Sequence, residues 1–214
     1  MGTTTDTLLV TDSATFRGSI SCPSNALSAQ SRDTILLQDP NAVFPIKLTD
    51  LRVWDAFQTP LPGTAATDDL ALIGGTFGTA HPMVQAGDLK AAGATTRYAR
   101  FTLVVPECYD EAETFSIVIS AGMKTTVADT SCTIDVECYK HDKVGGLGSD
   151  ICATAAQSIN SLTFADKSFT ITPASLTAGS VLDVRVTIAC NDAATGTAVT
   201  PTIANIDAVM DIKG

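Results

Sequence analysis

The chain has 214 residues, of which 45% are hydrophobic, 17% charged and 6% aromatic, so it carries enough apolar material for a folded core. Thirteen Lys and Arg against twenty-three Asp and Glu give a formal net charge of −10. A chain this acidic repels phosphate backbones and anionic lipid headgroups, which disfavours a nucleic-acid or membrane-surface role. Threonine makes up about one residue in seven while Lys and Glu are scarce, a bias that favours strands over helices.

The N-terminal residues lack the pattern of a targeting segment. No basic residue precedes Arg17, and the only early apolar run covers residues 8–10, which is too short for a signal peptide. No run of about 18 apolar residues offers a transmembrane helix. We therefore expect a soluble protein that is made in the cytosol.

Residues 1–33 are predicted to form an extended N-terminal arm. Ser, Thr, Asn and Gln dominate this segment, and its apolar residues are too scattered to close a core. An extended segment gains stability by adding main-chain hydrogen bonds and a few apolar anchors to a neighbouring surface. The alternative is that the arm covers its own domain as an edge strand. The candidate partner-binding residues are Leu8, Leu9, Val10, Phe16 and Ile20.

From Thr34 onward the chain changes to short apolar runs bounded by Pro, Gly and Asp, a pattern that predicts strands. The first of these runs are TILL, FPIKL and LRVWDAF. Residues 58–69 and 74–94 are predicted as long surface connections because Pro, Gly, Ala and Thr are frequent there. Trp54, the sole tryptophan, is on the predicted strand face of Arg52 and Ala56 and is either a sugar platform or a buried or interface residue.

The second half of the chain alternates apolar and polar residues, which places them on opposite faces of strands. This pattern covers residues 100–105, 115–120, 132–139, 182–190 and 204–212. It predicts an all-β fold in which residues 34–214 form one antiparallel two-sheet sandwich. The predicted core comprises Leu103, Phe115, Ile117, Ile134, Val136, Val184, Val186, Ile188, Ile206 and Met210.

Residues 150–162 leave two interpretations open. Their Ala content favours a helix, whereas their Ser, Asn and Thr favour a loop with one short strand. The sequence does not decide between the two.

The six cysteines are even in number and would fit three disulfides in an oxidising environment, although spacing alone identifies no pairing. No Cys-x-x-Cys occurs and the two histidines are far apart in sequence, which removes the usual zinc spacings. Cys132, Cys138 and Cys190 share the apolar face of their strands, so we expect them to be buried, unreactive small hydrophobes. Any disulfide is expected among the cysteines near loops or strand ends, which are Cys22, Cys108 and Cys152.

No motif indicates catalysis, a cofactor or a metal, so we expect a protein that is not an enzyme. Gly-x-Ser-x-Gly is absent, and His81 and His141 are each placed in a predicted loop or turn, although Asp142 could orient His141. The Gly-rich VGGLGSD lacks the Lys-Ser/Thr of a phosphate loop. The acidic residues of 107–113 lack the spacing of a calcium loop and favour a solvated turn.

Three stretches carry a family resemblance: DLKAAGATTRYARFTLVVP, SAGMKTTVADTSCTIDVECYK and SVLDVRVTIACNDAATGTAVTPTIANIDAVMDIKG. With their sandwich strands and Thr/Ala/Asp-rich loops, they resemble virion structural proteins of tailed bacteriophages, particularly head decoration or cement-type proteins. The resemblance covers about residues 34–214 and carries no site residue with it.

The resemblance implies a jelly-roll-like sandwich that sits on the capsid exterior as a homo-oligomer, with a trimer as the expected state. Its partner would be the major capsid protein, whose neighbouring subunits it would clamp against internal DNA pressure. Synthesis in the host cytoplasm agrees with the absence of a secretion pattern. The alternative is a carbohydrate-binding sandwich module of a larger surface assembly, which the same strand pattern permits and the low aromatic content disfavours.

Overall fold

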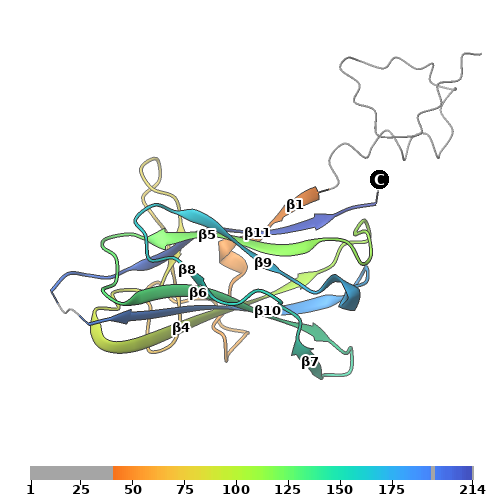
Figure 1. Ribbon diagram of the computed structural model, residues 1–214, viewed down its shortest axis with the longest axis horizontal. Coiled ribbons are helices and arrows are strands. Elements are labelled where there is room, and N and C mark those ends of the chain that lie inside the picture. Colours follow the sequence, from red (N-terminus) through yellow and green to blue (C-terminus); the bar gives the residue numbers. More distant parts are fainter. Residues whose placement is uncertain (1–40, 194–195, 214) are drawn as a thin grey trace, which may run out of the picture. The chain divides into compact units, whose positions relative to one another are not determined.

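This computed structural model describes residues 41–193 and 196–213, which form a sandwich of two β-sheets (Figure 1). The first sheet contains β1 (Asn41–Pro45), β2 (Ala71–Ile73), β3 (Met83–Gln85), β5 (Phe115–Met123), β9 (Ala165–Thr170) and β11 (Pro201–Asp211). The second contains β4 (Ala91–Val104), β6 (Ser131–His141), β7 (Leu147–Asp150), β8 (Gln157–Ser158) and β10 (Val181–Asp192). The predicted all-β sandwich is therefore confirmed.

Each sheet has its own strand order. The first sheet runs β2-β3-β11-β5-β9 with β1 on β11, and the second runs β4-β10-β6-β7 with β8 on β6. The pairings between these strands are antiparallel. β10 has the longest ladders, because it pairs with β4 along one edge and with β6 along the other.

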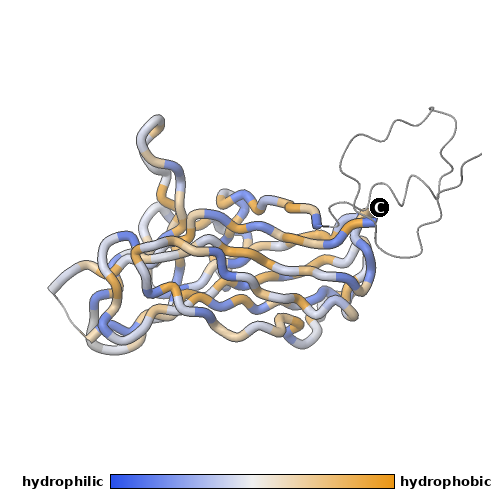
Figure 2. Tube along the Cα trace, turned by 45° about the horizontal axis from the view of Figure 1, so that its top comes forward, coloured by the Kyte–Doolittle hydropathy of each residue, from blue (hydrophilic) through white to orange (hydrophobic). Residues whose placement is uncertain are grey.

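Alternating side chains build the core between the two sheets, and Figure 2 shows hydrophobic and hydrophilic stretches following each other along the strands. The predicted core residues are buried, with one exception. Leu103 is half-buried because it lies on β4, at the edge of its sheet, but it still packs against the core. The largest side chains that complete the core include Phe101, Tyr109 and Phe169.

A β-bulge in β11 changes the predicted face of that strand. The pairing with β5 shifts between Ile203 and Asn205. As a result Ile203 is fully buried while Ala204, which the alternation places in the core, is only half-buried. The extra residue restores the predicted alternation from Ile206 onward.

The predicted strand over LRVWDAF is wrong. A short 3-10 helix (Leu48–Asp50) precedes it, and only Arg52 makes β-bridges, to Arg100 and Pro60. The chain then turns back on itself, because the N–H of Val53 donates to the carbonyl of Thr59 at 3.0 Å. Local turn bonds therefore replace the ladder that an alternating pattern would need.

One further prediction is wrong in part, and the region that the sequence left open is decided. Residues 74–94, predicted as one long connection, contain β3 and the start of β4. β3 forms because Val84 and Gln85 pair with Ile203 and Thr202 of β11. Residues 150–162 form a loop with the short strand β8, not a helix.

Two predicted segments lie outside the described residues: the arm, residues 1–33, and the TILL run, residues 34–37. Within the described ranges, no helix is long and apolar enough to span a bilayer. The second short 3-10 helix covers Pro173–Ser175 and leads into β10.

Candidate functional site

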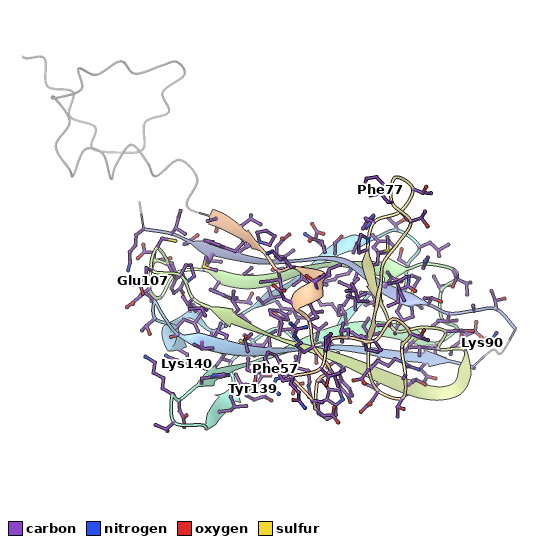
Figure 3. The ribbon with its side chains drawn as sticks, turned by 180° about the vertical axis from the view of Figure 1, so that it is seen from behind. Phe57, Phe77, Lys90, Glu107, Tyr139 and Lys140 are labelled. Carbon is purple, nitrogen blue, oxygen red and sulfur yellow. The ribbon has the colours of Figure 1, made fainter. Side chains whose placement is uncertain are left out.

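The loop between β2 and β3, residues 74–82, projects from the sandwich (Figure 3). Its tip is a closed turn, because the N–H groups of Thr79 and Ala80 both donate to the carbonyl of Thr76, at 2.9 and 2.8 Å. Gly75 has φ +66°, and a Cβ there would lie 2.5 Å from the Ala80 carbonyl oxygen. Only glycine fits at this position, so the sequence builds the loop into a defined shape.

Phe77 stands at the end of this loop (Figure 3), and its relative solvent exposure is 104%. Leaving a phenylalanine ring in water forgoes about 1.5–3 kcal/mol of burial free energy. The surroundings are also free of charge, since residues 70–87 contain no Asp, Glu, Lys or Arg although the chain carries −10 overall. An uncharged, fixed projection with an aromatic tip has the properties of a contact point for another molecule.

A cleft on the outer face of the second sheet is the other candidate. It lies between the 51–57 segment and the hairpin that joins β6 to β7, and continues past Leu147 to His141 and Lys143. Its walls carry aromatic, basic and acidic side chains: Trp54, Tyr139, Arg100, Arg185, Asp55 and Asp183. Mixed walls of this kind suit a polar ligand with flat apolar faces.

A partly buried ion pair lies in the wall of the cleft. Arg100 Nε donates to Asp183 Oδ1 at 2.6 Å, and a second nitrogen of the same guanidinium contacts Oδ2, so the pair is bidentate. The hydrogen bond to Asp183 is the main reason why the pKa of Arg100 is raised. His141 Nε2 lies 3.8 Å from Asp183 Oδ2 and has no hydrogen-bond partner among the described residues.

Trp54 lines the cleft and also fastens the 51–57 segment to the sheet. Its ring lies 5.0 Å from that of Tyr98, and the Arg185 guanidinium carbon is 5.6 Å from the Trp54 ring centre. The indole N–H donates to Asp68 Oδ2 at 3.0 Å. One side of the ring is therefore already in contact with a cation of the protein itself.

Asp142 does not orient His141 as the sequence suggested. Its Oδ1 accepts the N–H groups of Val144 and Gly146, at 2.8 and 2.7 Å. These bonds lower the pKa of Asp142 and close the turn between β6 and β7. His141 faces Asp183 instead, while His81 is exposed in the β2–β3 loop.

The acidic run 107–113 is a surface turn that is anchored by a buried tyrosine of the same segment. Tyr109 is fully buried and its hydroxyl donates to the Glu113 carbonyl at 2.8 Å. Glu111 accepts the Ala178 N–H at 3.3 Å, which ties the turn to the chain before β10. In the part of the chain that the structure describes, no group of three or more His, Cys, Asp or Glu could hold a metal ion.

The other sequence predictions on site residues divide into two groups. Cys132, Cys138 and Cys190 are buried as predicted, whereas Cys108 is exposed and Cys152 is half-buried. These five are free thiols in the structure. Cys22 and the predicted partner-binding residues Leu8, Leu9, Val10, Phe16 and Ile20 lie outside the described residues.

Phe77, Arg100 and Asp183 were not among the residues predicted from the sequence. A lone aromatic residue in the run GGTFGT is the one available signal for Phe77. No sequence signal identifies the Arg100–Asp183 pair, because the two residues are brought together only by the register of β4 and β10.

No protein-family profile matches the chain, and no curated protein sequence does. Among solved structures, the CBM22-1 xylan-binding domain of Paenibacillus barcinonensis Xyn10C is 13% identical, with a TM-score of 0.39 over 68% of this chain and 82% of that domain. The family 30 carbohydrate-binding module of Clostridium thermocellum cellulase CEL9D-CEL44B is 11% identical, with a TM-score of 0.42 over 79% and 98%. The infectious bursal disease virus Gx strain structure is 14% identical, with a TM-score of 0.37 over 82% of this chain and 33% of that one. These likenesses concern the β-sandwich fold alone.

Proposed function

We propose that this chain is a non-enzymatic virion structural protein that decorates a tailed-phage capsid and stabilises it through contacts with the major capsid protein. The observation that carries the proposal is the β2–β3 loop, which presents a fully exposed Phe77 on an uncharged projection. The family resemblance of residues 34–214 supplies the identity of the partner.

The loop is suited to docking for two physical reasons. Its turn is already closed by hydrogen bonds to the Thr76 carbonyl, so little conformational entropy is lost when a partner binds. The absence of charge between residues 70 and 87 means that no ionised group has to be desolvated at the contact. An aromatic side chain that enters a pocket on the partner then contributes a large share of the binding free energy.

The proposal extends to the assembly and its location. The protein would be made in the host cytoplasm and sit on the capsid exterior as a closed homo-oligomer, a trimer. Closed symmetry would present several Phe77 loops to the lattice at once, and such multivalent contact strengthens attachment without any new contact type.

The experiment uses capsids from a phage whose gene for this protein is deleted. Purified wild-type protein is added to these shells, and cosedimentation measures the bound fraction. We expect Phe77→Ser to lower the affinity at least about thirty-fold, as truncation of a central aromatic anchor does. Val144→Ser is the matched control, because Val144 is 88% exposed in the β6–β7 turn.

Both variants should keep the thermal midpoint of the wild type, since neither side chain belongs to the core. Wild-type protein that fails to bind the shells would contradict the decoration role. Wild-type binding that Phe77→Ser leaves intact would contradict the role of the loop.

A second candidate function is carbohydrate binding in the cleft beside Trp54. The observation that favours it is the combination of Trp54 and Tyr139 with the fixed Arg100–Asp183 pair on one open wall. Sugars bind to such sites by placing apolar ring faces on aromatic side chains and hydroxyls on held polar groups.

A glycan array followed by titration tests this candidate. If it holds, Trp54→Ala loses glycan binding while it still cosediments with shells, and Phe77→Ser does the reverse. Each variant thus controls for the other. A wild-type protein that binds no glycan on the array would remove the candidate.

A further inference from the structure

We propose that Cys132 and Cys190 are a disulfide site that can link β6 to β10 inside the core. Both are free thiols in the structure. This site differs from the disulfides predicted from the sequence, which involve Cys22, Cys108 and Cys152, and it does not depend on the proposed function.

The register of the second sheet places the two cysteines directly opposite each other. Both side chains lie on the core face of their strands, where their exposure is 0% for Cys132 and 1% for Cys190. Two cysteines on the same face at the same register position are neighbours without any backbone movement.

The hydrogen bonds of β6 show whether Cys132 and Cys190 form a hydrogen-bonded or a non-hydrogen-bonded pair of the antiparallel ladder. The Cys132 carbonyl accepts the N–H of Ile159, on the β8 side of the strand, at 2.9 Å. Because the N–H and C=O of one strand residue point to the same side, Cys132 has no main-chain bond to Cys190 across the ladder. Such a non-hydrogen-bonded antiparallel pair has its Cα atoms about 4.5 Å apart. That separation falls within the range of about 4.4–6.8 Å that disulfides span.

The thiols also interact with each other. A hydrogen bond to Cys190, followed by burial, raises the pKa of Cys132. Cys138 provides the contrast on the same strand face, since it lies opposite Val184 and burial, not a hydrogen bond to another thiol, is the main reason why its pKa is raised to about 12.

The reaction is thiol–disulfide exchange with a small-molecule disulfide as the oxidant. The thiolate of one cysteine attacks the disulfide RSSR, forms a mixed disulfide and releases one RSH after protonation. The second cysteine, as its thiolate, attacks the protein sulfur of that mixed disulfide and releases the second RSH. Two thiols are oxidised and one RSSR is reduced to two RSH. Because both sulfurs are buried, the exchange takes place while β6 and β10 come together during folding.

The test is to unfold the full chain under reducing conditions and refold it in a buffer of reduced and oxidised glutathione. After quenching with N-ethylmaleimide in denaturant, peptide mass mapping identifies which cysteines are linked. We expect the Cys132–Cys190 peptide pair to be linked in the refolded protein. The oxidised form should melt about 5–15 °C above the reduced form, because the bond closes a long loop of the unfolded chain.

Two variants sharpen the result. Cys190→Ala should abolish the rise in thermal midpoint under oxidising conditions. Cys138→Ala, at an equally buried position of β6, should leave that rise and the Cys132–Cys190 link intact. A refolded wild-type chain whose Cys132 and Cys190 both carry N-ethylmaleimide, or in which either is linked to another cysteine, would overturn the proposal. The mapping of wild-type protein decides this even if a variant does not fold.

Discussion

Asp183 is a carboxylate that water hardly reaches, although its strand position faces away from the core. It is 4% exposed, and Arg100 satisfies both of its oxygens. Arg100 also lies over the ring of Phe57, with 5.0 Å from its guanidinium carbon to the ring centre. A single arginine therefore neutralises a buried charge and holds the segment that covers it.

This arrangement predicts an unequal cost for two ion pairs. Arg100→Ala should lower the free energy of unfolding by about 1–3 kcal/mol, because it leaves a buried carboxylate without its partner. Lys90→Ala breaks the Lys90–Asp88 pair, whose side chains are 41% and 36% exposed, and should cost less than about 1 kcal/mol. Urea unfolding at neutral pH measures both values. Equal losses in the two variants would contradict the role assigned to Arg100.

Among the secondary-structure elements, the long strands were predictable and the short ones were not. β6 and β10 alternate over many residues, so their buried faces follow from the sequence alone. In β6, the predicted inward residues Cys132, Ile134, Val136 and Cys138 are all buried. A long alternating pattern is decisive because a one-residue shift would expose every apolar side chain.

The short strands depend on partners far away in the sequence. β3 has three residues, and it exists as a strand because Val84 and Gln85 meet β11. The LRVWDAF segment shows the opposite case, in which a predicted strand does not form. Its alternating residues Leu51 and Val53 are buried, but the main chain makes no continuous ladder. Alternation thus predicts which side chains are buried there but not whether the main chain forms a strand.

The candidate sites also contain some residues that local sequence identifies and others that only the folded structure brings together. Trp54 could be singled out from the sequence because it is the only tryptophan. The polar wall around it could not, because Arg100 and Asp183 come from strands that are distant in the chain and paired by register. The exposure of Phe77 could not be predicted for another reason. Hydrophobic periodicity carries no information in a loop, and the exposure depends on the turn that Gly75 permits.

In the molecule as a whole, the two candidate sites belong to different sheets. The Phe77 loop joins β2 and β3 of the first sheet, whereas the Trp54 cleft is formed on the second. Neither Phe77 nor Trp54 belongs to the hydrophobic core that lies between the two sheets. Substitutions at the two sites should therefore act independently, which is what the crossed variants use.

The last prediction concerns deletion of residues 2–20, which removes the candidate partner-binding residues Leu8, Leu9, Val10, Phe16 and Ile20. The core that joins the two sheets already includes buried residues from Leu51 to Met210, so the shortened chain should fold with a nearly unchanged thermal midpoint. Under the decoration proposal, an extended arm adds main-chain bonds and apolar anchors to a neighbour, and its loss should abolish assembly or attachment.

Light scattering reports the oligomer, cosedimentation with shells reports attachment, and a thermal melt reports the fold. Phe77→Ser tests the loop contact separately, because it leaves the arm in place and should weaken attachment without abolishing it. A large drop in the midpoint with assembly intact would instead show that the arm covers its own sandwich as an edge strand.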